Sequence, residues 1–142
     1  MAAVVSGFAS GLADTSAKAP QVSIGAEAHS DSYILVEHKG GDTLAIDSID
    51  LRTFIPSGTY ADMSYNINLD DTGNVTVISE SSSRILQTGD SIKIKWCAAF
   101  AESSYLGSIY YMAPSVGEPL DIEVYDSSSG KVTGTTRVTV LP

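Results

Sequence analysis

Residues 121–140, DIEVYDSSSGKVTGTTRVTV, carry the pattern that decides the fold. Ile122 and Val124 alternate with polar and aromatic neighbours, which is the two-residue period of a strand with one buried face. The run DSSSGK is rich in residues that favour turns, and Val138 and Val140 resume the alternation after it. We therefore predict a β-hairpin that is apolar on one face and polar on the other.

The same alternation extends upstream through most of the chain. Pro20 ends any preceding helix, Gly40 to Asp42 form a tight-turn sequence, and residues 56–72 look irregular. Short strands at this spacing are typical of an antiparallel, immunoglobulin-like β-sandwich, so we predict a mainly β protein with one head domain over residues 19–142. The remaining predicted strands cover residues 21–28, 32–38, 43–48, 49–53, 74–80, 91–96 and 105–112.

The N-terminal stretch MAAVVSGFASGLA differs from everything that follows it. It is uncharged and apolar, and small residues recur every four positions, so in a helix they would line one face. Such faces let helix backbones approach closely, and we predict a short α-helix over residues 1–18 that packs against other helices. The alternatives are a disordered terminus or the remnant of a signal peptide. The residues predicted to carry this assembly helix are Ala3, Gly7, Phe8, Gly11 and Leu12.

This stretch is too short to cross a bilayer alone, because a spanning helix needs about 20 apolar residues. It also lacks the positively charged region that begins a secretory signal. We therefore expect Met1 to lie inside a longer natural helix, of which residues 1–18 are the lower end. The codons upstream of Met1 test this expectation.

Composition excludes several classes of function. The 142 residues carry a net charge of −9, from 17 acidic and 8 basic residues, so neither nucleic acid nor an anionic membrane surface is an expected partner. The single cysteine, Cys97, excludes an internal disulfide. Because it lies in the apolar run WCAAF, we expect a buried structural thiol.

No pattern in the sequence points to catalysis. A phosphate-binding glycine loop, a metal-spaced His/Cys cluster and a nucleophile elbow are all missing, so we expect no enzyme activity, no cofactor and no small-molecule substrate. The strongest candidate for a metal is a weak calcium site at Asp70 and Asp71, which Asp47 and Asp50 could join in space. A solvated turn is the alternative.

Two further features concern the surface. Asn74 begins the sequence Asn-Val-Thr, an acceptor for N-glycosylation where a turn enters a strand. Tyrosine is abundant near residue 105, and a side chain with a large apolar body and a polar tip suits subunit contacts. We take Tyr105, Tyr110 and Tyr111 as the candidate contact surface.

The order of these segments resembles a known family. A strand is followed by His-x-Gly-Gly-Asp-x-Leu, formed by His38, Gly40, Gly41, Asp42 and Leu44. Together with the N-terminal stretch, the strand start GDSI at 89–92 and the final hairpin IEVYDSSSGKV, it resembles the archaeal type IV pilins. The resemblance covers the chain up to residue 53 and again from 89 to 140, and it rests on the order of turn-and-strand patterns.

The resemblance implies a structural subunit of an extracellular filament that attaches cells to surfaces or to each other. The full-length helix would lie in the membrane before assembly and in a bundle of helices at the filament axis afterwards. Its partners would be further copies of this chain, arranged head to tail in a helical filament. The charged leader and cleavage site of a pilin precursor are not among these residues, which fits a start inside the helix.

Two other functions stay open at this stage. The first is a membrane-anchored binding module for a glycan or a protein, with its site in residues 56–72 and 105–111. The second is an archaellum subunit or an archaellum stator component, because these share the plan of a helix followed by a sandwich.

Overall fold

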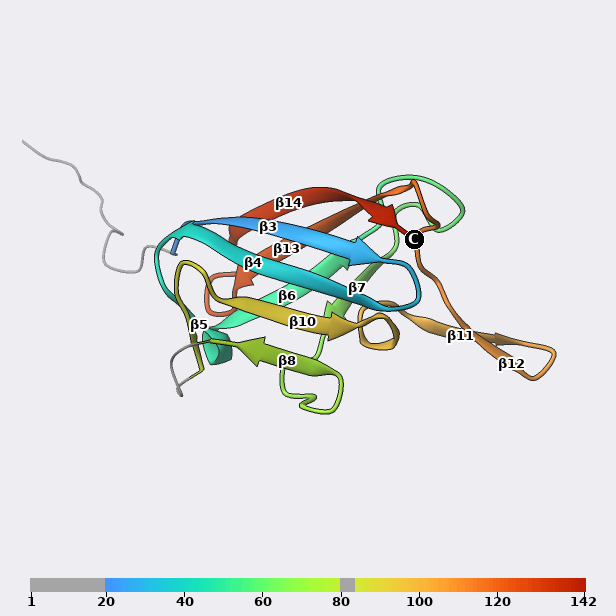
Figure 1. The fold of residues 1–142 in the computed structure, drawn as a ribbon, viewed down its shortest axis with the longest axis horizontal. Helices are drawn as coiled ribbons and strands as arrows, with labels where there is room; N and C mark the ends of the chain where they lie inside the picture. Colours follow the sequence, from blue (N-terminus) through green and yellow to red (C-terminus); the bar gives the residue numbers. More distant parts are fainter. Residues whose placement is uncertain (1–19, 80–83) are drawn as a thin grey trace, which may run out of the picture.

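The computed structural model describes residues 20–79 and 84–142, and they form a mainly β structure (Figure 1). The predicted helix over residues 1–18, with its assembly residues Ala3, Gly7, Phe8, Gly11 and Leu12, lies outside the described residues. The strands are β3 (Val22–His29), β4 (Tyr33–Gly41), β5 (Leu44–Ala45), β6 (Ile49–Phe54), β7 (Ser64–Ile67), β8 (Val75–Ile78), β9 (Ile85–Leu86), β10 (Ser91–Lys95), β11 (Glu102–Tyr105), β12 (Ser108–Tyr111), β13 (Pro119–Asp126) and β14 (Val132–Leu141).

Eight of these strands form one curled sheet in the order β7-β6-β13-β14-β3-β4-β10-β8. Neighbours in it pair antiparallel, except β14 and β3, which pair parallel through Val140 with Ala28 and Leu141 with His29. The prediction of antiparallel pairing throughout is therefore wrong at this junction. Strands joined by a short hairpin must be antiparallel, but β3 and β14 come from opposite ends of the described chain and escape that constraint.

The sheet curls around a single apolar core. Along β10 and β13 every second residue is buried, as the alternation predicts. Thr53 on β6 is also buried, and its hydroxyl donates a hydrogen bond to the backbone carbonyl of Ala99 (2.7 Å), which ties β6 to the segment after β10. The largest fully buried side chains are those of Ile34, Leu44, Ile46, Leu51, Ile92, Ile94, Leu120, Ile122 and Val140, with Thr53.

Three predicted segments differ from the structure. The strand expected over 43–48 is the two-residue β5 followed by a short 3₁₀ helix, Ile46–Ser48. The segment 56–72 is not wholly irregular, because it contains β7. The strand expected over 105–112 is instead half of a hairpin in which Leu106 and Gly107, both with positive φ, turn the chain back between β11 and β12.

The turn between β13 and β14 is closed by the carboxylate of Asp126. Its Oδ2 atom accepts hydrogen bonds from the Ser128 hydroxyl (2.8 Å), the Ser129 amide (3.1 Å) and the Ser129 hydroxyl (2.7 Å). These bonds lower the pKa of Asp126 below its ordinary value. The bond from the Ser129 hydroxyl is the largest cause, and the bond from the Ser128 hydroxyl adds to it. The predicted DSSSGK turn is thus held by the charged form of its first residue.

We expect the hairpin turn to weaken in acid. A pKa that is lower in the folded state means that the Asp126 carboxylate stabilises the fold above its unfolded pKa, and that this contribution is lost as pH falls through its folded pKa. Asp126→Asn should therefore lower the melting temperature slightly at neutral pH and leave it almost unchanged near pH 2. Thermal melts followed by circular dichroism check this, and an equal loss at both pH values would contradict it.

Candidate functional site

The His-x-Gly-Gly-Asp-x-Leu segment forms the corner where β4 ends. The Nε2 atom of His38 lies 2.7 Å from the backbone carbonyl oxygen of Asp42. The Asp42 carboxylate accepts a hydrogen bond from the backbone amide of Gln21 (2.9 Å). Gly41 has φ +101°, and Leu44 is buried in the core. These contacts hold the end of β4 against the residue that precedes β3. In the described residues the role of this segment is therefore structural.

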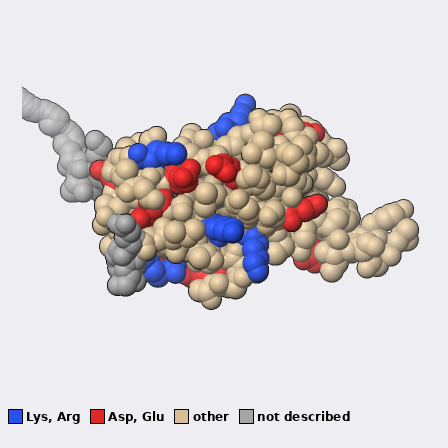
Figure 2. Space-filling model, in the orientation of Figure 1, with Lys and Arg blue, Asp and Glu red and all other residues tan. Residues whose placement is uncertain are grey.

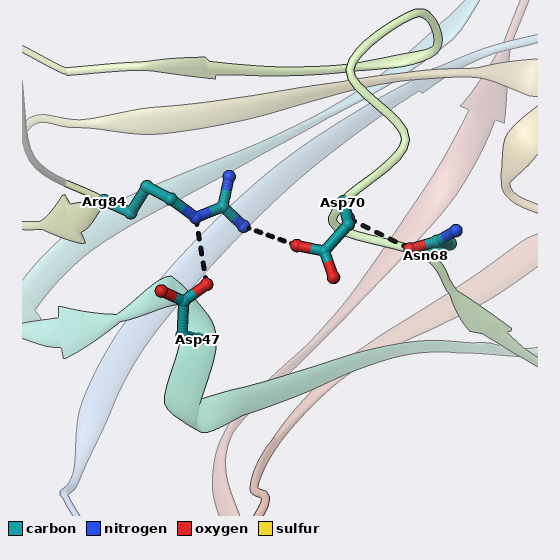
Figure 3. Close-up of polar contacts among 4 residues, drawn as sticks. All are labelled: Asp47, Asn68, Asp70 and Arg84. Carbon is teal, nitrogen blue, oxygen red and sulfur yellow. Dashed lines mark hydrogen bonds and ion pairs between the residues drawn. The ribbon is translucent and has the colours of Figure 1, made fainter.

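An arginine side chain lies across the candidate calcium site. Arg84 donates from Nε to Asp47 (3.0 Å) and from Nη2 to Asp70 (3.0 Å), so its guanidinium lies between the two carboxylates (Figure 3). The Asp71 carboxylate instead accepts a hydrogen bond from the side-chain amide of Asn74 (2.8 Å). Asp70 and Asp71 therefore have different partners, and no group of three or more His, Cys, Asp or Glu in residues 20–79 and 84–142 is placed to hold a metal ion.

The Arg84 cluster joins three separate segments of the chain. Asp47 lies in the 3₁₀ helix after β5, Arg84 directly precedes β9, and Asp70 follows β7. The Asp70 amide also donates to the side chain of Asn68 (3.0 Å), which shapes the loop that presents the carboxylate. All three charged side chains are substantially exposed, so each pair contributes at most about 1 kcal/mol.

Asn74 lies where the turn enters β8, as predicted. Its side-chain amide, the group that a glycan would modify, donates to Asp71, and the side-chain oxygen is 3.8 Å from the sulfur of Cys97. Glycosylation therefore requires the bond to Asp71 to break, and it stays a prediction.

Cys97 is exposed, so the prediction of a buried thiol is wrong. A 3₁₀ helix, Trp96–Ala98, begins where β10 ends, and the buried–exposed alternation of that strand continues through Trp96 and Cys97. Trp96 and Phe100 stay buried, with ring centroids 4.7 Å apart, while Cys97 turns outward. The outward direction of Cys97 follows the alternation of the preceding strand, and the prediction of burial failed because it rested on the apolar composition of the run.

Cys97 lines an open hollow of about 480 Å³ on the outer face of the sheet. Its walls come from the β3–β4 turn, the start of β4, the end of β10, the 3₁₀ helix after it and the end of β12. Lys95 on β10 pairs with Tyr33 on β4, and the Nζ atom of Lys93 lies 4.5 Å from the centre of the Tyr33 ring. The lining residues are Asp31, Ser32, Tyr33, Lys93, Lys95, Trp96, Cys97 and Tyr111.

The hollow carries two lysines and one aspartate, so its lining is slightly basic on an acidic protein. Neither Lys93 nor Lys95 forms an ion pair within the described part of the chain, whereas Lys39, Arg84 and Arg137 do. Figure 2 shows basic side chains gathered over the end of β10 on this face. Two unpaired ammonium groups beside aromatic rings can bind an anionic group or a tyrosine hydroxyl.

The candidate contact residues separate into two places. Register places Tyr105 and Tyr110 on one face of the β11–β12 hairpin and Tyr111, opposite Glu102, on the other. Tyr105 and Tyr110 are exposed, while Tyr111 packs at the edge of the core and lines the hollow. Desolvation raises the pKa of Tyr111, and Cys97 and Glu102 raise it further, so its hydroxyl stays protonated at neutral pH.

The hollow is not evident from the sequence. The alternation in IKIKW shows that both lysines point away from the core, and two outward lysines in a chain of charge −9 were the available signal. Their convergence with Tyr33 and Tyr111 depends on strand pairing and on the 3₁₀ helix after β10, which the alternation does not reveal.

Comparison with known proteins gave no match to any family model and no match to a curated protein. The resemblance to archaeal type IV pilins therefore stays a prediction. Among the helices of the described residues, none has the length and apolarity that crossing a membrane requires.

Proposed function

We propose that this chain is a structural subunit of an extracellular, type IV pilus-like filament of archaea that mediates attachment to surfaces or cells. Residues 1–18 are the lower end of its assembly helix, and residues 19–142 are an immunoglobulin-like sandwich head displayed on the filament surface. The subunit carries out no reaction and holds no cofactor. Its partners are further copies of itself, and the membrane holds its full-length helix before assembly.

The observation that carries this proposal is the position of β3 in the sheet. β3 begins at Val22, shortly after the N-terminal segment, and lies between β14 and β4 rather than at an edge. A pull on the N-terminal segment therefore passes first to β4, which pairs with β3 from Val22 onward, and then to β14, which pairs with β3 at Ala28 and His29. A filament subunit needs this connection, because tension passes between its assembly helix and its head.

The surface of the head is also suited to a filament. A net charge of −9 keeps filaments soluble and mutually repelling. Closely packed heads must then meet through local surfaces that are not acidic. The apolar β11–β12 hairpin and the basic hollow beside it are two such surfaces.

Mass spectrometry of filaments sheared from the native cells tests the proposal. We expect the chain in the sheared fraction, with a mature N-terminus upstream of Met1 that begins a long apolar helix. Recovery from membranes or medium, with none in the sheared fraction, would contradict the proposal. Comparing swimming and attachment in a deletion strain then separates a pilus from an archaellum, because loss of swimming with normal attachment identifies an archaellum component.

The hollow favours a second candidate, a surface-anchored module that binds an acidic glycan. Lys93 and Lys95 would pair with carboxylate or sulfate groups, and Tyr33 would pack against a sugar ring. A glycan array probed with the 142-residue chain tests this candidate. Two results together would favour this candidate over the filament. The chain binds acidic glycans and Lys93→Ser abolishes the binding, and the native cells carry no filaments that contain the chain.

A further inference from the structure

The β11–β12 hairpin, residues 102–111, is a finger that projects from the body of the protein and carries exposed apolar and aromatic side chains (Figure 1). Leu106 at its tip is 87% exposed, Tyr105 is 70% exposed and Ile109 is 63% exposed. The finger carries no charge beyond Glu102 at its base, and Figure 2 shows it without basic or acidic side chains over most of its length. An isolated two-stranded hairpin is at best marginally stable in water, so this exposed apolar surface calls for a partner.

The turn of the finger is a second, independent sign of function. Leu106 has φ +51° and Gly107 has φ +84°, the two positive values of a type I′ turn. Asparagine and glycine adopt this conformation readily, whereas a branched apolar residue does so at a cost of about 1 kcal/mol. Leu106 recovers little of that cost within its own chain, because its side chain is almost wholly exposed. A strained residue with so exposed a side chain points to an external contact.

The same chain offers a receptor for the finger. The hollow is lined by aromatic residues, among them Tyr33 and Trp96, and by Lys93 and Lys95, with Asp31 as its acidic residue. Two copies of a chain with a charge of −9 repel each other overall, and a lining with two lysines and one aspartate weakens that repulsion locally. An uncharged finger that brings apolar side chains and tyrosine hydroxyls, which accept hydrogen bonds from ammonium groups, fits both parts of the hollow.

We propose that the tip of the finger, residues 105–110, is seated in the Tyr33–Lys93–Lys95 hollow of a second copy of this chain. This inference rests on the proposed filament and names one of its contacts between heads. The surface involved is small, so the contact is weak between free chains and is strengthened by repetition along a filament. Cys97 on the hollow gives a natural reporter, because a cysteine placed on the seated finger would lie beside it.

Disulfide trapping tests the contact with the 142-residue chain. The donor carries Ser108→Cys and Cys97→Ser, and the acceptor is the unaltered chain labelled with nitrogen-15, so mixed dimers are identified by mass. Under mild oxidation we expect the mixed disulfide to form at least about tenfold faster than with a control donor, Val132→Cys and Cys97→Ser, because seating raises the effective concentration of the two thiols. Val132 is likewise exposed but lies away from the finger.

Leu106→Asn, added to the donor, separates a binding role from a structural one. We expect the melting temperature to stay unchanged or to rise, because asparagine suits the turn, while trapping slows to the rate of the control donor. Trapping no faster than the control, or trapping that Leu106→Asn leaves unchanged, overturns the inference. Protection of Cys97 by a soluble acidic glycan without trapping also overturns it and assigns the hollow to a glycan.

The filament proposal and the proposed finger contact can be contradicted independently. Sheared filaments that contain the chain but give no link between the Ser108→Cys finger and Cys97 would overturn the contact and leave the filament proposal standing. Trapping in solution by a chain that is missing from the sheared fraction would overturn the filament and leave a contact between two copies.

Discussion

Replacing Gly41 with alanine is expected to lower the free energy of unfolding by about 3 kcal/mol, whereas Gly40→Ala changes it by less than about 1 kcal/mol. Gly41 has φ +101°, and a Cβ atom there would lie 2.5 Å from the backbone oxygen of Gln21. A Cβ atom at Gly40 would meet nothing within 4 Å. The two neighbouring glycines therefore form a matched pair that differs in backbone conformation and in local space.

Urea unfolding of both variants, with the unaltered chain as reference, measures this difference. The clash at Gly41 involves backbone rather than a movable side chain, so relief requires the ends of β3 and β4 to separate. The Asp42 amide, which donates to the Gln21 carbonyl (3.0 Å), should then exchange its hydrogen faster in Gly41→Ala. Equal stability of the two variants would show that the corner adjusts without cost.

Alternation predicted the parts of the fold that depend on local pattern. The core sides of β10 and β13 and the terminal hairpin follow from the two-residue period, because burial of one face fixes which side chains point inward. The pattern could not reveal the parallel pairing of β14 with β3, which depends on how a single sheet curls. At Cys97 the alternation gives the exposed side that the structure shows, and the apolar composition of WCAAF was the misleading signal.

The β11–β12 finger could not be predicted from the sequence for a related reason. The run from Tyr105 to Met112 is apolar enough to look like a core strand, and only Gly107 within it indicates a turn. Its tyrosines were predicted as a contact surface from residue type alone. What the sequence could not show is that Tyr111 lies in the hollow with Lys93 while Tyr105 projects away from the core.

Gly134→Val is expected to lower the free energy of unfolding by about 2–3 kcal/mol through overpacking at the junction of β14 with β3. A Cβ atom at Gly134 would lie 2.9 Å from a side-chain methyl group of Val22 and 3.0 Å from its backbone oxygen. Thr135→Val, on the exposed neighbouring position of the same strand, is the control for the higher strand propensity of valine and should cost nothing. Equal effects of both substitutions would contradict the prediction.

Gly41 and Gly134 approach the same point from two sides. Gly41 on β4 lies against the backbone of Gln21, and Gly134 on β14 lies against that of Val22, so the glycines let two strands close on the first residues of β3. Combining Gly134→Val with Val22→Ala should recover part of the lost stability, about 1 kcal/mol, because it removes the methyl contact and leaves the backbone contact. No recovery would show that the backbone oxygen alone limits the approach. In a filament this clamp would transmit the pull of the assembly helix, so the heads of Gly134→Val filaments should unfold under weaker shear than the heads of Thr135→Val filaments.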